Sequence, residues 1–426
     1  MKPYNTMPRE DLLREKESLS AVFASHKAKG LSLNMARGKP GKDQLALSMP
    51  MLDLINSTSA CTAEDGVDCR NYGELTGIAD AKKLFAEYLE VSADEIIIAG
   101  STSLTFMYDC MARAMLTGVL GSERPWIKEE KVKFLCPVPG YDRHFSICQF
   151  LGIEMINIPT TEEGPDMDMI EELVAHDPLI KGMWCVPKYS NPLGLTYSDK
   201  TIRALAALKP AARDFRIFCD NAYAMHEVYR DVPLLNPLTA CKEAGNPNMI
   251  YLFGSTNKIT FPGAGVAFFA ASRENIAFTT KQLSMQAIGW DKLNMLRHVL
   301  FLKDAAGIHA QMKKHAEILR PKYDAVLQKL EKELAGLGAG KWIKPDGGYF
   351  ITFIAETGCA KRIVSLCKEA GVIMTDAGAT HPYGKDPEDR YIRIAPTFPS
   401  LADLGAAMEV FCTAVKLATV ERMTAN

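Results

Sequence analysis

The residues of greatest chemical interest follow short apolar runs of the sequence, at the point where each run ends. Two such runs are followed by Asp220 and by Lys258. A buried carboxylate needs a cationic or hydrogen-bonded partner, and a protected lysine amine can attack a carbonyl carbon. Taken singly, either residue could equally be a capping aspartate or a surface lysine, so only their common position suggests a site.

Three earlier apolar runs end in polar turns. The first turn contains Ser101, Thr102 and Ser103 ahead of a helical pattern, and such a turn offers N–H groups and hydroxyls to a phosphate. The second contains Tyr141, which could stack on a flat ring, and the third contains Asn191 before a proline. Helix capping, loop packing and turn chemistry are the alternative explanations of these residues.

Short apolar runs alternate with helical patterns over residues 68–303. The runs are Glu95–Ala99, Val132–Cys136, Ile153–Pro159, Gly182–Val186, Ile217–Cys219, Met249–Phe253 and Val266–Ala270. Continuous apolar runs of this length are typical of strands buried on both faces, and their alternation with helices predicts an α/β domain with a mainly parallel sheet. Ligands bind beyond the carboxyl ends of such strands, which is where the polar turns lie.

The remaining segments predict a second, smaller domain. One long helical pattern covers residues 303–337, and a mixture of strand and helix patterns follows it. We therefore expect an N-terminal helix and arm over residues 1–45 that joins the small domain, a large domain over 46–310 and a small α+β domain over 311–426.

Composition excludes several classes of protein. The 426 residues include 49 Lys and Arg against 51 Asp and Glu, and this near-neutral balance argues against nucleic-acid or acidic-membrane partners. No apolar stretch is long enough to span a membrane, and residues 1–30 have no signal-peptide core. The 11 cysteines form no C-x-x-C pair, and the 8 histidines show no metal-ligand spacing. We expect a cytoplasmic protein without a metal.

The order and spacing of Asn191, Asp220 and Lys258 resemble those of the fold-type I aminotransferases, which use pyridoxal phosphate. The resemblance covers most of the chain and is greatest for the divergent subgroup (Ic) of aspartate aminotransferases. The motifs of that subgroup read R-G-K-P and D-K-x-N-x-L-R-H, and they correspond here to Arg37–Pro40 and Asp291–His298. The resemblance implies a large cofactor-binding α/β domain, a smaller α+β domain and pyridoxal phosphate as cofactor.

The resemblance also implies roles for the central residues. Lys258 would form the Schiff base with the cofactor and later move the substrate's proton. Asp220 would keep the pyridine nitrogen protonated, and such a pair is strong in a water-poor site. Tyr223 and Asn191 would hydrogen-bond the phenolic oxygen of the cofactor, and Tyr141 would stack on its ring.

Further cofactor contacts follow from the same resemblance. His144 would support Asp220 from behind. Hydroxyls would hold the phosphate, and they belong to Ser101, Thr102, Ser103 and Ser255. Tyr72 would reach the phosphate of the other subunit, so that the active site lies at a homodimer interface. The arginine that relatives carry after Pro262 and Gly263 is missing from this chain.

Substrate contacts are expected from both parts of the chain. Arg393 would grip the α-carboxylate of an amino acid with its planar fork, and Gly38 would let the backbone close over the same group. The distal arginine of dicarboxylate-specific relatives has no obvious counterpart. We expect Arg143 to replace it because it follows Tyr141 closely, and Arg297 or Lys292 are the alternatives.

The function predicted on this basis is transamination from L-aspartate to 2-oxoglutarate, giving oxaloacetate and L-glutamate. Alternatives within the enzyme class are transamination of aromatic or other amino acids and β-elimination. The alternative outside it is a regulator that only senses pyridoxal phosphate. Regulators of that type carry a fused DNA-binding domain, and the segment before Leu31 is too short for one.

Overall fold

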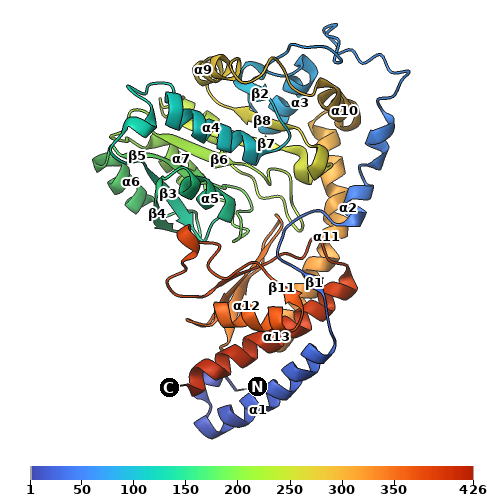
Figure 1. Ribbon diagram of the computed structural model, residues 1–426, viewed down its shortest axis with the longest axis vertical. Helices are drawn as coiled ribbons and strands as arrows, with labels where there is room; N and C mark the ends of the chain where they lie inside the picture. The colour runs from blue at the N-terminus through green and yellow to red at the C-terminus, as the bar shows by residue number, and fades with distance from the viewer. Residues whose placement is uncertain (1, 426) are drawn as a thin grey trace.

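A seven-stranded sheet forms the centre of the larger part of the molecule (Figure 1). The computed structural model describes residues 2–425. Across the sheet the strands are β2 (Ile96–Ile98), β8 (Ala267–Ala270), β7 (Ile250–Ser255), β6 (Arg216–Asp220), β5 (Ile180–Cys185), β3 (Lys133–Val138) and β4 (Glu154–Pro159). All neighbouring pairs are parallel except those of β8, which runs antiparallel to both β2 and β7. The predicted mainly parallel sheet is confirmed.

Helices cover both faces of this sheet, and each face has its own apolar core. One core joins α4 (Ser103–Thr117), α5 (Asp142–Phe150) and α9 (Arg273–Leu283) to inward residues such as Phe134 and Phe218. The opposite core contains Leu135 and Ile217, which precede or follow those residues on the same strands. Its helices are α3 (Ala79–Leu89), α6 (Met167–His176), α7 (Asp199–Ala207), α8 (Pro237–Glu243) and α10 (Lys292–Leu302). Alternate residues of each strand therefore face different layers.

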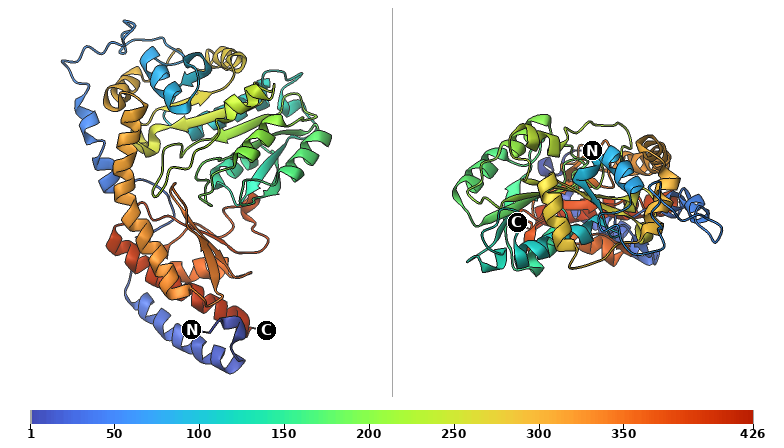
Figure 2. Two further views of the ribbon diagram at one scale, coloured as in Figure 1. Left: turned by 180° about the vertical axis from the view of Figure 1, so that it is seen from behind. Right: turned by 90° about the horizontal axis from the view of Figure 1, so that it is seen from above.

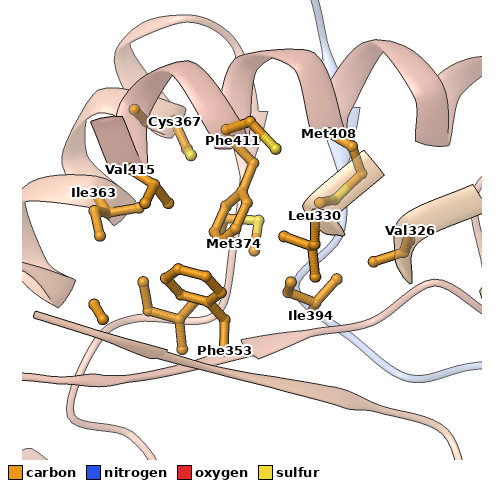
Figure 3. Packing of buried hydrophobic residues seen from close by; sticks show 14 of the residues in the cluster. Val326, Leu330, Phe353, Ile363, Cys367, Met374, Ile394, Met408, Phe411 and Val415 are labelled. Atoms are coloured by element: carbon orange, nitrogen blue, oxygen red, sulfur yellow. The ribbon is translucent and has the colours of Figure 1, made fainter. Parts of the chain in front are cut away.

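A smaller α+β part lies beyond the carboxyl ends of the strands (Figures 1 and 2). Its antiparallel sheet has the order β12 (Tyr391–Ile394), β10 (Ile351–Ala355), β9 (Gly340–Ile343), and β1 (Leu33–Asn34) pairs in parallel with β11 (Val372–Ile373). Its helices are α1 (Arg9–Ala28), α12 (Ala360–Glu369) and α13 (Leu401–Thr424), and the short α2 (Lys42–Ala46) lies on the connecting arm. Figure 3 shows part of its core, where Phe353 packs edge-on against Phe411.

The long helix α11 (Ala305–Leu334) joins the two parts. Its first turns contribute Ile308 and Met312 to a core of the large sheet, whereas Leu319 and Leu330 belong to the core of the small part. The helix is continuous across residue 310, so the predicted division between 310 and 311 stays a prediction.

Single-turn 3₁₀ helices complete the fold. They are η1 (Tyr4–Thr6), η2 (Met49–Asp53), η3 (Ala93–Glu95), η4 (Trp126–Lys128), η5 (Thr256–Lys258), η6 (Pro262–Ala264) and η7 (Pro382–Gly384). Within residues 2–425, no helix combines the length and apolar character that crossing a membrane requires. The 11 cysteines are all free thiols.

Candidate active site

A cavity of about 270 Å³ opens where the strand ends of the large sheet face the small part. Its walls combine residues from β6, η5, the first turn of α5, strand β12 and the N-terminal arm. Eight residues predicted from the sequence line it, namely Gly38, Tyr141, Arg143, Asn191, Asp220, Tyr223, Lys258 and Arg393. The remaining lining residues are Arg37, Lys39, Asp142, Val186, Ala222 and Phe350. Residues more than 350 positions apart in the sequence thus meet in one space.

Asp220 ends the buried strand β6 and is held from behind by a histidine. Its Oδ2 lies 3.1 Å from Nε2 of His144. The imidazole stacks on the indole of Trp184, with ring centroids 4.2 Å apart and an interplanar angle of 8°. The other oxygen, Oδ1, is buried and has no hydrogen-bond partner in the described part of the chain. One oxygen therefore fixes the carboxylate, while the other remains available to a ligand in the cavity.

Lys258 lies in η5, directly after β7, and its amine is surrounded by aromatic rings. The Nζ atom lies 5.0 Å from the ring centre of Tyr223 and 5.8 Å from that of Tyr349. Burial lowers the pKa of the Lys258 amine, and the nearby Asp220 carboxylate partly opposes this shift. A lowered pKa increases the fraction of neutral amine, which is the nucleophilic form.

Two tyrosines of the cavity keep their hydroxyl protons at neutral pH. Burial, followed by the charge of Asp220, raises the pKa of Tyr141 to about 12. Burial also raises the pKa of Tyr223 well above its usual value. Both hydroxyls can therefore donate a hydrogen bond to an oxygen that carries negative charge.

Arg393 enters the cavity from β12 and is almost fully buried. Its Nη1 donates to Oδ1 of Asn191 and to Oδ1 of Asp142, both at 3.1 Å. Nη2 donates to the hydroxyl of Thr375 at 3.2 Å, and the guanidinium carbon lies 4.6 Å from the ring centre of Phe350. These contacts hold the planar fork at the cavity wall, where it can meet a carboxylate.

The predicted phosphate hydroxyls lie beside the cavity rather than in its lining. Ser255 pairs with Ala267 across β7 and β8, and the N–H of Ala267 donates to the carbonyl of Gly100 at 3.1 Å. Ser255 and the turn that begins at Gly100 therefore share one edge of the sheet. The hydroxyl of Thr102 accepts from the N–H of Thr105 at 3.1 Å and caps α4. Ser101 and Ser103 belong to the same turn, at the positive end of that helix.

The other predicted residues lie outside this cavity. Tyr72 is 82% exposed on a loop. Lys292 is buried and its Nζ donates to the carbonyl of Gly73 at 3.1 Å. Arg297 donates to Oδ1 of Asn294 at 2.6 Å. Of the three cations considered for a distal carboxylate, only Arg143 lines the cavity of its own chain.

Comparison with known proteins identifies the family to which this site belongs. Residues 7–426 match the family described as aspartate amino-transferase. The chain belongs to the aspartate aminotransferase family. A protein of Mycolicibacterium smegmatis is 46% identical over 422 residues, or 99% of either chain. An aspartate aminotransferase of Corynebacterium glutamicum is 43% identical over 406 residues, covering 95% of this chain and 94% of the relative.

Solved structures agree with this membership. The crystal structure of an aspartate transaminase from Corynebacterium glutamicum superposes with a TM-score of 0.96, at 41% identity over 99% of both chains. An α-aminoadipate aminotransferase of Thermus thermophilus, 20% identical, reaches 0.75 over 94% of this chain and 95% of its own, and supports the fold alone. The predictions of an aminotransferase family, an α/β fold and transaminase activity are confirmed.

Pyridoxal phosphate, the cofactor of aspartate aminotransferases, fits the residues at hand. The free Oδ1 of Asp220 suits a protonated ring nitrogen, and the buried amine of Lys258 suits an aldehyde. The ring of Tyr141 suits a flat ligand, and the positive end of α4 suits a phosphate. The cofactor prediction agrees with this family membership.

Several site residues were missed in the sequence. Trp184 supports His144, and Asp142 and Phe350 contact Arg393. Phe350 meets Arg393 only in the folded chain, so no local pattern marks it. The signal for Asp142 was its place between Tyr141 and Arg143, both of which were selected.

Proposed function

We propose that this transaminase transfers the amino group of L-aspartate to 2-oxoglutarate. The observation that supports this most is the meeting of Lys258, Asp220 and Arg393 in one cavity with a further cation, Arg143, at its rim. Arg393 would bind the α-carboxylate and Arg143 the second carboxylate of a dicarboxylic substrate. The family match and the C. glutamicum aspartate aminotransferase support the same substrate class.

The proposed chemistry assigns one task to each side chain. When bound, pyridoxal phosphate supplies a carbonyl carbon and an electron-accepting ring. Lys258 would hold the group at this carbon through its neutral amine Nζ, and once the substrate's own amine has released it, the same Nζ would take the proton from Cα of the substrate. Asp220 holds positive charge at the ring nitrogen through Oδ1, and His144 keeps its carboxylate in place. The hydroxyl of Tyr223 would donate a hydrogen bond to the negatively charged oxygen on the cofactor ring.

The phosphate end relies on hydroxyls and backbone N–H groups in this proposal. The N–H groups at the start of α4 and the hydroxyl of Ser255 would bind the phosphate. The hydroxyl of Thr102 caps this helix and would lie beside the phosphate. The positive end of a fifteen-residue helix favours an anion at this point.

We also propose that the enzyme works as a cytoplasmic homodimer. The supporting feature is an exposed apolar surface formed by Tyr72, Met285 and Ile288, which are 82%, 85% and 67% exposed. The two segments meet at Gly73 and Gly289, where a Cβ on Gly289 would lie 2.1 Å from the carbonyl oxygen of Gly73. A patch of this kind suits a partner surface, and free cysteines suit a reducing compartment.

The substrate proposal is tested on the holoenzyme with single amino acids. Aspartate and glutamate should convert the visible cofactor absorbance to that of the amine form, faster than alanine or phenylalanine do at equal concentration. A preference for an aromatic or small amino acid would contradict the proposal and favour one of the alternative substrates. Pyruvate and ammonia formed from serine or cysteine, which carry a leaving group at Cβ, would indicate β-elimination instead.

A further inference from the structure

The first turn of α5 places a carboxylate on the arginine proposed to bind the substrate. Oδ1 of Asp142 accepts a hydrogen bond from Nη1 of Arg393 at 3.1 Å. The side chain of Asp142 is 30% exposed, whereas that of Arg393 is only 6% exposed. A partly exposed carboxylate thus neutralises a nearly buried guanidinium.

Two of the four other N–H donors of Arg393 are engaged, and both hydrogens of Nη1 are in use. Nη1 also donates to Asn191 and Nη2 to Thr375. Nε is buried without a partner among the described residues, and Phe350 covers a face of the guanidinium group. A carboxylate that binds the two Nη atoms with two parallel hydrogen bonds must therefore replace a bond that Nη1 already makes.

We infer that Asp142 is a positioning residue that occupies Arg393 until the α-carboxylate of the substrate displaces it. This inference deepens the proposed function, since it rests on the proposed role of Arg393. An unpaired guanidinium in such a buried place would be costly, and Asp142 removes that cost in the resting enzyme. Asn191 and Thr375 are neutral and stay bound when the carboxylates exchange, so Arg393 keeps its orientation. Asp142 then turns toward solvent, to which it is already partly open.

Competition between Asp142 and a ligand for Arg393 predicts a defined pattern of ligand affinities. Every ligand with an α-carboxylate must compete with Asp142, so Asp142 weakens the binding of all of them by the same factor. If Asp142 instead only repelled the distal carboxylate of a substrate, beside Arg143, it would weaken the binding of dicarboxylates alone. Monocarboxylates and dicarboxylates therefore distinguish the two explanations.

The test replaces Asp142 by the isosteric amide. Succinate and propionate, which carry no amino group, are titrated calorimetrically into the holoenzyme of wild type and of Asp142→Asn. We expect both dissociation constants to fall by roughly fivefold, because a bond between two charges becomes a bond to a neutral amide. For the amino-acid substrate, KM should fall similarly while kcat stays within about twofold.

Two further variants complete the experiment. Asp199→Asn removes the equivalent charge from the first turn of α7, far from the cavity, and should leave both constants unchanged. Asp142→Glu keeps the charge and should bind both ligands no more tightly than wild type. Unchanged or weaker binding in Asp142→Asn would overturn the inference, and so would a gain confined to succinate. These titrations need no turnover, so a failure of the aspartate proposal would be seen separately in the absorbance assay.

Discussion

The loop that follows β7 and the first turn of α5 lie on the same cavity but are held in opposite ways. Helix α10 holds the loop through its segment Asp291–His298. Nδ2 of Asn294 donates to the carbonyls of Ala264 and Gly265 at 3.1 and 3.0 Å. Nε2 of His298 lies 3.0 Å from the hydroxyl of Thr256. Each of these contacts joins two parts of the protein itself and holds the backbone that carries Lys258.

The tautomer of His298 follows from its neighbours. Its Nδ1 lies 2.8 Å from the carbonyl of Asn294, which can only accept, so Nδ1 carries the proton. In the neutral ring Nε2 is then the acceptor, and the hydroxyls of Thr256 and Thr260 lie 3.0 and 2.9 Å from this atom. Burial lowers the pKa of His298 and so favours this neutral form.

The first turn of α5 shows the reverse arrangement. Asp142 and His144 reach across to Arg393 and Asp220, on β12 and β6, and Arg143 lines the cavity rim. Oδ1 of Asp220 and Nε of Arg393 remain buried without partners among the described residues. The comparison indicates that α10 holds the loop after β7 in place, whereas the first turn of α5 contacts the two residues, Asp220 and Arg393, whose unpartnered atoms can meet a ligand. Substitutions in the two regions should therefore have different effects.

The largest effect is expected on the cavity side, from Asp220→Asn. The amide cannot hold a positive charge at the ring nitrogen, so the rate of single-turnover amino transfer should fall by roughly 10²–10³-fold, as when one preorganised charge partner is removed. The denaturant midpoint should change little, because the loop after β7 is untouched. A variant that lost its fold along with its activity would contradict this separation.

Lowering the pH should lower the free energy of unfolding through the buried histidines that contact the loop after β7. Burial lowers the pKa of His298 and of His315 to about 4, from 6.5. Between these values the unfolded chain binds protons that the folded chain refuses, so stability falls as the pH falls from about 6.5 to 4. The loss should approach about 3 kcal/mol for each histidine. Denaturant midpoints at fixed protein concentration measure it.

The same titration has an internal control. His298→Gln should flatten the slope of stability against pH in this window, since a buried histidine with a lowered pKa is gone. A variant with the wild-type slope would show that His298 has the same pKa in the folded and the unfolded chain. The interpretation that neutral His298 holds the loop after β7 would then be wrong.

Asn294→Ala should destabilise the loop without abolishing the chemistry. Two carbonyls lose their donor, which costs about 2 kcal/mol of unfolding free energy. Turnover of the folded enzyme should stay within roughly tenfold of wild type, since Asn294 does not line the cavity. Asn5→Ala, at an exposed site, is the matched control. A loss of activity with unchanged stability would place Asn294 in the chemistry instead.

The smallest effect is expected from Arg143→Ala. Removing an exposed cation at the rim should lower kcat/KM for aspartate by roughly tenfold and that for alanine by less than twofold. Arg203→Ala, at a remote exposed position, controls for the loss of surface charge. Equal losses for both amino acids would mean that Arg143 does not select a second carboxylate.

Much of this organisation could be predicted from the sequence because it follows local rules. The strand runs, the long helical pattern and the polar residues after the strands reflect periodicity and the geometry of parallel sheets. Asp220 and Lys258 could be selected because strand ends meet at one edge.

Contacts that close over long distances in the chain could not be predicted in this way. The pairing of Arg393 with Asp142 joins segments 251 residues apart, and the stacking of His144 on Trp184 depends on how two layers pack. The segment Asp291–His298 was used only as a mark of resemblance, and its hydrogen bonds to the loop became visible in three dimensions.

The account depends most on the identity of the lysine that carries the cofactor. Reduction of the holoenzyme with borohydride, followed by proteolysis and mass spectrometry, maps the phosphopyridoxyl group to a single peptide. We predict that the label is on Lys258, at one equivalent per chain. A label on Lys292, on any other lysine or on none would contradict the proposed site and every role assigned around it.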